Sequence, residues 1–301
     1  MPTPNTALLS LIAQAHDEQW EELDLSGMEL SELPLEIRQL KGLRRLVLGK
    51  WDEENSKYVG NLFKEIPKIV FELTQLEELV ISSNQITEIP DVIGRLSHLI
   101  TLALSDNQIA EIPDAIGQLS HLTTLDLSDN QIIEIPDAIG QLSHLITLDL
   151  YINQITKIPD AIGQLSHLTT LDLRVNQVTE IPDAIGQLSN LTDLFLRDNQ
   201  ITEIPDAIAK LSNLTKLDLC DNQITEISDA IAKLTKLTQL YLSSKQITSI
   251  PDSIAQLTNL RSLGLENNPI QNVPPEIVRK GWGETTFSEG EPQIIFTYLK
   301  S

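Results

Sequence analysis

The sequence predicts an α/β solenoid, in which a curved parallel sheet lines the concave face and short helical or 3-10 turns line the convex face. Three observations support this fold class. A pattern of 23 residues recurs along most of the chain, each copy contains a short alternation of leucine with other residues, and the pattern stops near both ends, where we expect caps. A fixed period of this length indicates stacked repeats, because one copy is too small to bury its own apolar edge.

The period is visible in asparagine and proline. An asparagine recurs every 23 residues from Asn84 to Asn222, and a proline recurs at the same spacing from Pro90 to Pro205. One full copy reads L-x-x-L-x-L-x-x-N-x-I-x-x-I-P-x-x-I-x-x-L-x-x, which resembles a leucine-rich repeat. Eleven such coils cover residues 20–282, and they start at Trp20, Leu43, Leu76, Leu99, Leu122, Leu145, Leu168, Leu191, Leu214, Leu237 and Leu260.

Each part of the coil predicts one element. The L-x-L alternation has the period of a strand whose leucines point inward, and successive coils place these strands side by side as a parallel sheet. The asparagine is expected inside the following turn, where its amide bonds backbone groups that have no strand partner. The segment I-P-D-A-I-G-Q-L returns as a short helical turn, with proline and aspartate suited to its start.

The two ends and one insertion depart from the repeat. Residues 1–19 are expected to form an N-terminal capping helix, with apolar residues at helical spacing between Leu8 and Ala15. Residues 283–301 are expected to be a C-terminal cap or the start of a linker to a following domain, and this end of the chain gathers Trp282 and Phe287. Ten extra residues fall near 49–60; we expect an exposed loop, which is either tolerated decoration or a binding element.

Composition narrows the class of partner. Lys+Arg number 21 against 43 Asp+Glu, which gives a formal net charge of −22. Such a charge repels nucleic acid and anionic membranes. The lone Cys220 forms no internal disulfide and no metal or redox motif. With no apolar stretch of membrane-spanning length and no secretory signal, we expect a cytoplasmic protein.

The sequence does not predict an enzyme. It contains no phosphate-binding loop, nucleophile elbow, zinc-protease motif or dinucleotide fingerprint, so we expect no cofactor and no catalytic residues. Repeated aspartates on the convex side indicate solvated turn starts, with weak cation binding as the alternative. Four histidines lie 23 residues apart, and a surface file is the first interpretation, with metal binding as the alternative. They are His98, His121, His144 and His167.

Aromatic and arginine side chains gather at outward positions near the middle of the predicted concave face. Between Leu76 and Leu265 the aromatic residues all take outward positions, where packing of the core does not require a ring. Rings, arginines and exposed apolar groups are typical of binding hot spots, and an aspartate rim favours a neutral to basic protein or peptide. The alternative is that the two arginines only neutralise neighbouring aspartates. The predicted protein-binding residues are Tyr151, Ile152, Arg174, Val175, Phe195, Arg197, Asp149, Asp172, Asp218 and Tyr241.

The ends of the chain resemble one family of repeat proteins. The opening L-I-A-Q-A-H-D-E-Q-W-E-E-L-D-L-S-G and the closing N-P-I-Q-N-V-P-P-E-I-V-R-K-G-W-G are similar to the borders of the leucine-rich-repeat domain in bacterial Roco proteins. The resemblance implies that a Ras-like GTPase domain of the same polypeptide follows the repeats. No GTPase motif lies within residues 1–301, so no nucleotide-binding role carries over.

These observations favour a non-catalytic protein–protein interaction module. Through the resemblance, its role is the sensor or regulatory arm of a Roco-type GTPase. The alternative is a stand-alone repeat protein that acts as a scaffold, inhibitor or effector by binding a separate protein.

Overall fold

The computed structural model describes residues 6–243, 246–273 and 292–299, and it divides into two compact units, Met1–Leu145 and Ile146–Ser301. The boundary falls within the run of repeats. Trp282 and Phe287 of the expected C-terminal cap lie outside the described residues.

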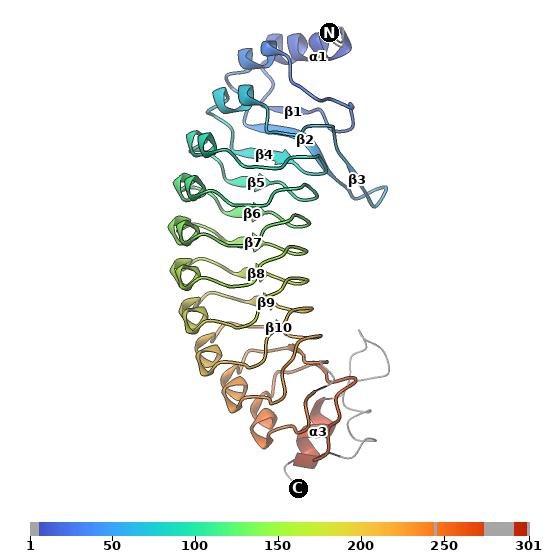
Figure 1. The fold of residues 1–301 in the computed structure, drawn as a ribbon, viewed down its shortest axis with the longest axis vertical. Helices are drawn as coiled ribbons and strands as arrows, with labels where there is room; N and C mark the ends of the chain where they lie inside the picture. Colours follow the sequence, from blue (N-terminus) through green and yellow to red (C-terminus); the bar gives the residue numbers. More distant parts are fainter. Residues whose placement is uncertain (1–5, 244–245, 274–291, 300–301) are drawn as a thin grey trace. The chain divides into compact units, whose positions relative to one another are not determined.

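Unit 1 is a parallel sheet with one short 3-10 turn after most strands (Figure 1). The strands are adjacent in the order β1-β2-β4-β5-β6, and β3 pairs antiparallel with β2. Its elements are α1 (Thr6–Asp17), β1 (Glu22–Asp24), η1 (Leu35–Gln39), β2 (Arg45–Asp52), β3 (Lys57–Val59), η2 (Lys68–Glu72), β4 (Glu78–Ile81), η3 (Asp91–Arg95), β5 (Thr101–Ala103), η4 (Asp114–Gln118), β6 (Thr124–Asp126) and η5 (Asp137–Gln141).

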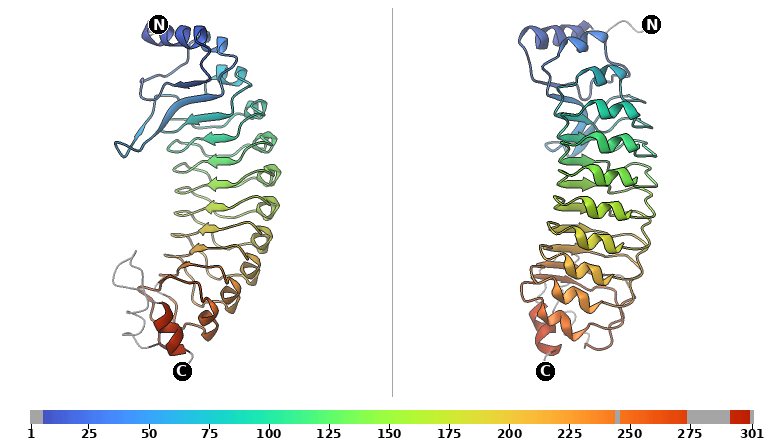
Figure 2. Two further views of the ribbon diagram at one scale, coloured as in Figure 1. Left: turned by 180° about the vertical axis from the view of Figure 1, so that it is seen from behind. Right: turned by 90° about the vertical axis from the view of Figure 1, so that its left-hand side faces the viewer.

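Unit 2 repeats the same arrangement, with parallel strands in the order β7-β8-β9-β10-β11-β12. The register advances by one repeat per strand, so that Leu148 pairs with Leu171 and Leu171 with Leu194. Its elements are β7 (Thr147–Asp149), η6 (Asp160–Gln164), β8 (Thr170–Asp172), η7 (Asp183–Gln187), β9 (Asp193–Phe195), η8 (Asp206–Lys210), β10 (Lys216–Asp218), η9 (Asp229–Lys233), β11 (Gln239–Tyr241), η10 (Asp252–Gln256), β12 (Ser262–Gly264) and α3 (Pro292–Leu299). In both units the strands lie on one side and the 3-10 turns on the other (Figure 2). The predicted solenoid of strand and helical turn is therefore confirmed.

The repeated leucines and isoleucines form the core. In the coil that begins at Leu168, the three leucines of the strand segment, Leu168, Leu171 and Leu173, have no exposed surface. The repeated asparagine is buried in the turn as predicted. The amide of Asn176 donates to the carbonyls of Leu150 and Leu173 at 2.9 and 3.1 Å, and its oxygen accepts the Ile155 N–H at 2.9 Å. Each asparagine therefore ties two coils together and satisfies backbone groups that the sheet leaves free.

Small residues allow the helical turns to stack closely. A Cβ at Gly117 in η4 would lie 2.8 Å from the Ala138 carbonyl oxygen of the next turn. Proline precedes most turns as the N-cap residue, in an extended conformation. Where Ser228 replaces that proline, its hydroxyl accepts the Ala230 N–H at 3.1 Å, so this turn gains a side-chain cap.

Both ends of the chain carry a helix in the described residues. Helix α1 packs on η1 and buries Leu8, Ile12 and Ala15. Helix α3 packs on η10 and buries Ile295 and Phe296. Among the described residues, no helix has the length and apolar character needed to cross a bilayer.

Candidate functional site

All ten predicted binding residues belong to unit 2, on the surface formed by outward side chains of β7 to β11 and the turns that follow them; we call this surface the unit 2 sheet face. The aspartates that end three of these strands have a structural role. Asp149, Asp172 and Asp218 each accept the backbone N–H of the residue two positions further on, at 3.0 Å. Each carboxylate therefore caps the chain where it leaves the strand. From the sequence these aspartates were predicted only as part of an acidic rim.

Arg174 is the centre of the contacts on this face. Its guanidinium carbon lies 4.9 Å from the ring centroid of Tyr151 and 5.1 Å from that of Phe195, so the cation interacts with two rings from neighbouring coils. The same guanidinium donates to both carboxylate oxygens of Asp172, with Nε at 2.9 Å from each. The hydrogen bonds that it donates to Asp172 raise the pKa of Arg174 above its ordinary value. The structure thus brings Tyr151, Arg174, Phe195 and Asp172 together.

Arg197 and Tyr241 make contacts outside the cluster of Tyr151, Arg174 and Phe195. Arg197 donates to Asp221 at 3.0 Å and to Asp198 at 3.3 Å, and all three side chains are 39–47% exposed. The Tyr241 ring lies against Gly264, where a Cβ would come within 2.9 Å of the ring. Both arginines therefore pair with aspartates, and Arg174 in addition contacts two rings.

Two apolar residues on this face adopt a backbone conformation that disfavours them. Ile152 and Val175 have φ of 52° and 55°, in the left-handed region. The corresponding position of other coils holds Asp106, Asp198 or Asp221, residue types that tolerate this region, whereas β-branched side chains rarely enter it. Val175 is also 38% exposed. Such strain concentrates at functional sites, because stability alone selects against it.

Burial changes the chemistry of two neighbouring groups. Burial raises the pKa of the Asp218 carboxyl, although Arg197 and Arg174 oppose the shift. Burial and the charge of Asp218 raise the pKa of the Cys220 thiol to about 12. The thiol is therefore protonated at neutral pH, and a reactive nucleophile at Cys220 is not supported.

The histidine file has a structural explanation. The Nδ1 atoms of His98, His121 and His144 lie 2.8–3.0 Å from carbonyl oxygens of the preceding coil, and because a carbonyl only accepts, each Nδ1 carries the proton. Asn190 and Asn213 make the same bond, at 2.8 Å, in later coils. In the described ranges no group of three or more His, Cys, Asp or Glu side chains could hold a metal ion.

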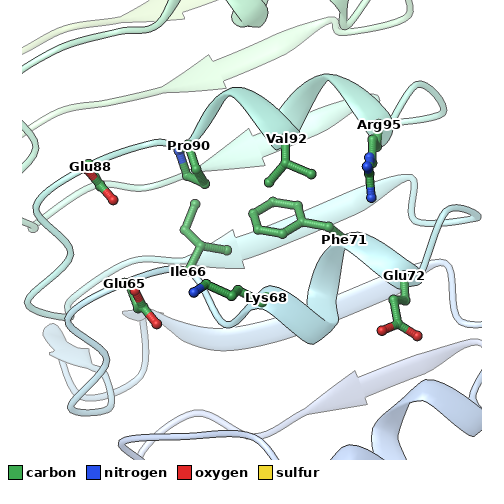
Figure 3. Close-up of a pocket in the computed structure, with 9 residues that line it drawn as sticks. All are labelled: Glu65, Ile66, Lys68, Phe71, Glu72, Glu88, Pro90, Val92 and Arg95. Atoms are coloured by element: carbon green, nitrogen blue, oxygen red, sulfur yellow. The ribbon is translucent and has the colours of Figure 1, made fainter.

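A cavity of about 310 Å³ opens in unit 1 between η2 and η3 (Figure 3), and sequence analysis did not predict it. Phe71 takes the position that Gly117 has in η4, and its ring, together with Ile66, Pro90 and Val92, forms an apolar floor. A ring in place of a hydrogen atom keeps the two turns apart. The rim carries both acidic and basic side chains, so the cavity selects no sign of charge: Glu65, Lys68, Glu72, Glu88 and Arg95.

Comparison with known proteins gives a family match over most of the chain. The family described as "Leucine rich repeat" matches residues 59–109, 74–132, 120–178, 166–223 and 212–270. A search of curated protein sequences gave no significant match.

Several solved structures are similar to this chain. A leucine-rich-repeat protein of Leptospira interrogans is 30% identical, with a TM-score of 0.70, over 92% of this chain and 81% of that one. The Arabidopsis receptor kinase HAESA, solved in complex with the peptide hormone IDA and the co-receptor SERK1, is 28% identical, with a TM-score of 0.65, over 82% of this chain. The chain spans 46% of that receptor structure. An internalin of Listeria monocytogenes, 24% identical with a TM-score of 0.67 over 89% of this chain and 82% of that one, shares the fold.

Proposed function

Because the chain belongs to the leucine-rich-repeat family, we propose that it is a non-catalytic module that binds a protein or peptide through the unit 2 sheet face. Repeats of this family suggest protein–protein interaction, and HAESA was solved with a peptide hormone and a protein co-receptor. The contact residues of the proposal are Tyr151, Ile152, Arg174, Val175, Phe195, Arg197 and Tyr241, with Asp149, Asp172 and Asp218 between them.

One observation carries this proposal. On two successive coils, a strained apolar residue stands beside a side chain of the ring and guanidinium cluster: Ile152 follows Tyr151, and Val175 follows Arg174. In two coils of unit 1 these two positions hold serine and aspartate, as in Ser128 and Asp129. The strained position is also an aspartate after Arg197 and after Cys220. The backbone is satisfied by the common residues, so the exceptions serve the surface and not the fold.

The chemistry of the face favours a neutral to basic partner. Apolar side chains and rings supply the buried centre of an interface, and the aspartates around them are complementary to positive charge. Burial raises the pKa of Asp218, and a nearby cation of the partner stabilises the charged form of this carboxyl. The net charge of −22 repels a polyanionic partner.

The test is selection of binding peptides from a random library on the wild-type chain. Peptides that use this face should lose most of their affinity for Tyr151→Ala/Phe195→Ala, on the order of a hundredfold for two hot-spot rings. They should keep their affinity for Ile146→Ala, a matched change at a 44% exposed apolar side chain of the same unit. Equal binding to both variants rejects the site.

The finer role is the regulatory arm of a bacterial, cytoplasmic Roco-type GTPase, and the terminal residues that resemble that family support it. In this role residues 1–19 and 283–301 are a capping helix and a cap or linker around the repeats of 20–282. The size of the native protein in its own cell lysate tests it. A band well above 33.5 kDa is expected. A band at 33.5 kDa rejects it in favour of the stand-alone scaffold, inhibitor or effector.

A further inference from the structure

The ten-residue insertion forms a hairpin in unit 1. Strands β2 and β3 pair antiparallel with Trp51 opposite Tyr58, and the two rings lie edge to face, 4.9 Å between centroids. The sequence predicts an exposed loop here, and the structure shows instead a paired hairpin. Figure 1 shows the hairpin on the side of unit 1 away from the helical turns.

The hairpin is built into the fold and is not a loose loop. At its base, a Cβ on Gly49 would lie 2.0 Å from the Ser82 carbonyl oxygen, and one on Gly60 would lie 1.4 Å from that of Ser83. Two glycines therefore let the insertion cross the turn after β4 in backbone contact. At the tip, Asp52 accepts the Glu54 N–H at 3.1 Å and the Asn55 side-chain amide at 2.7 Å.

The aromatic pair is open to solvent beside carboxylates of β6 and of the turns after β5 and β6. Trp51 is 49% and Tyr58 38% exposed. The hairpin crosses the turn after β4, where the Ser83 N–H donates to the Ser105 carbonyl at 2.8 Å. The Asp106 N–H in turn donates to the Ser128 carbonyl at 3.0 Å, so the next two turns along the sheet carry Asp106 and Asp129. Burial, together with the charges of Asp126, Asp106 and Asp129, raises the pKa of Tyr58.

Within the part of the chain that the structure describes, Asp106, Asp126 and Asp129 form no ion pair. The lysines of the hairpin act elsewhere: Lys50 pairs with Asp24, and Lys57 influences Asp52 at the tip. Burial and the charge of Asp106 raise the pKa of Asp129, so the carboxylates of Asp106 and Asp129 repel each other.

We infer that the hairpin and the sheet next to it form a second recognition surface, which binds a basic peptide segment by placing an arginine or lysine between the Trp51–Tyr58 pair and the carboxylates of Asp106, Asp126 and Asp129. The rings supply cation–π attraction and apolar area, and the carboxylates supply charge complementarity and hydrogen-bond acceptors. This surface lies in unit 1 and shares no residue with the proposed site in unit 2.

The test uses a fluorescein-labelled hexa-arginine peptide and the full chain, followed by fluorescence anisotropy. A hexa-citrulline peptide, which has a similar shape without charge, should not bind. Trp51→Ala should weaken hexa-arginine binding by on the order of tenfold, and Asp106→Asn/Asp129→Asn by at least as much. Asparagine tolerates the left-handed backbone of both positions, and circular dichroism checks that each variant is folded.

The matched control is Asp91→Asn/Asp114→Asn, which removes the same charge from exposed positions on the helical turns of the same unit. It should change binding less than twofold, so equal weakening by both double variants overturns the inference, because attraction to the net charge alone predicts that result. Unchanged binding by Trp51→Ala also overturns it. Loss of hexa-arginine binding only in Tyr151→Ala/Phe195→Ala assigns the peptide to unit 2, which supports the proposed function and rejects the second surface.

Discussion

Removal of the Arg174 side chain should destabilise unit 2 by about 3 kcal/mol, which is large for a residue on a surface. The Asp172 side chain is 6% exposed, so water cannot replace the guanidinium at its carboxylate. Without Arg174 the carboxylate keeps only the backbone N–H of residue 174. Breaking a buried ion pair costs about 3–5 kcal/mol, and because the Arg174 side chain is 39% exposed we take a lower cost of about 2 kcal/mol. Loss of two ring contacts adds about 1 kcal/mol.

A double-mutant cycle measures this directly. Arg174→Ala, Asp172→Asn and the double variant are unfolded in urea and followed by circular dichroism. Because asparagine still accepts the backbone N–H and carries no charge, the double variant should be more stable than the sum of the single changes by about 2 kcal/mol. Arg197→Ala is the control, since its partners are exposed and its loss should cost less than about 1 kcal/mol.

Two results refute the reasoning. If Arg174→Ala costs no more than Arg197→Ala, the carboxylate of Asp172 does not depend on its partner. If the single changes add without coupling, the two side chains do not act as a unit. A change in the slope of the urea transition indicates that a different part of the chain unfolds as a unit. In that case the stability is measured locally, from hydrogen exchange of the β8 and β9 amides, and not from the global unfolding free energy.

Three further changes test other features. Val175→Asn should leave the unfolding free energy unchanged or raise it by up to about 1 kcal/mol, because relief of the left-handed strain offsets the lost apolar contact; a loss above that size contradicts the strain argument. Asp218→Asn should stabilise the protein at neutral pH, where the wild-type carboxyl is charged and partly buried. The gain in unfolding free energy should shrink as pH falls toward the raised pKa of the folded carboxyl, because the wild-type carboxyl is then protonated and no longer carries the charge. Urea unfolding at pH 7.5 and 4.5 measures this difference, and a gain independent of pH excludes the charge as its cause. Phe71→Ala should cost about 3 kcal/mol, the lower end for a buried phenylalanine because its ring borders a cavity; a cost below about 1 kcal/mol means that the ring does not hold the turns apart.

The 23-residue period predicted the parts of the structure that repeat. It placed the strands, the 3-10 turns and the asparagines, because each depends on spacing within one coil. The asparagine series extends one step further than the sequence analysis counted: Asn61, which follows the insertion, donates to the Leu25 and Leu48 carbonyls at 2.8 and 2.7 Å. Its distance of 23 residues from Asn84 was the signal available.

Features that depend on neighbouring coils were beyond the reach of the pattern. The sequence placed Tyr151, Arg174 and Phe195 on one face, but their mutual contacts follow from rotamers and from the step between strands. The positive φ at Ile152 and Val175 was equally hard to predict. The only signal was that other coils hold aspartate at the same position, a residue type that tolerates the left-handed region. The hairpin was expected as a loop because nothing in its ten residues reveals which turn it crosses.

Comparison of the coils separates structural residues from binding residues on the unit 2 sheet face. In unit 1, Asp126 accepts both the backbone N–H and the hydroxyl of Ser128. Asp149 and Asp172 make the same backbone bond, but tyrosine and arginine stand where serine does in that coil. Where it occurs, the aspartate therefore serves the backbone, and the residue two positions later varies between coils. Phe195 and Tyr241 take the aspartate's position in their own coils, so this position varies as well. We therefore propose that recognition by the unit 2 sheet face depends on the positions that vary between coils, which hold Tyr151, Ile152, Arg174, Val175, Phe195, Arg197 and Tyr241.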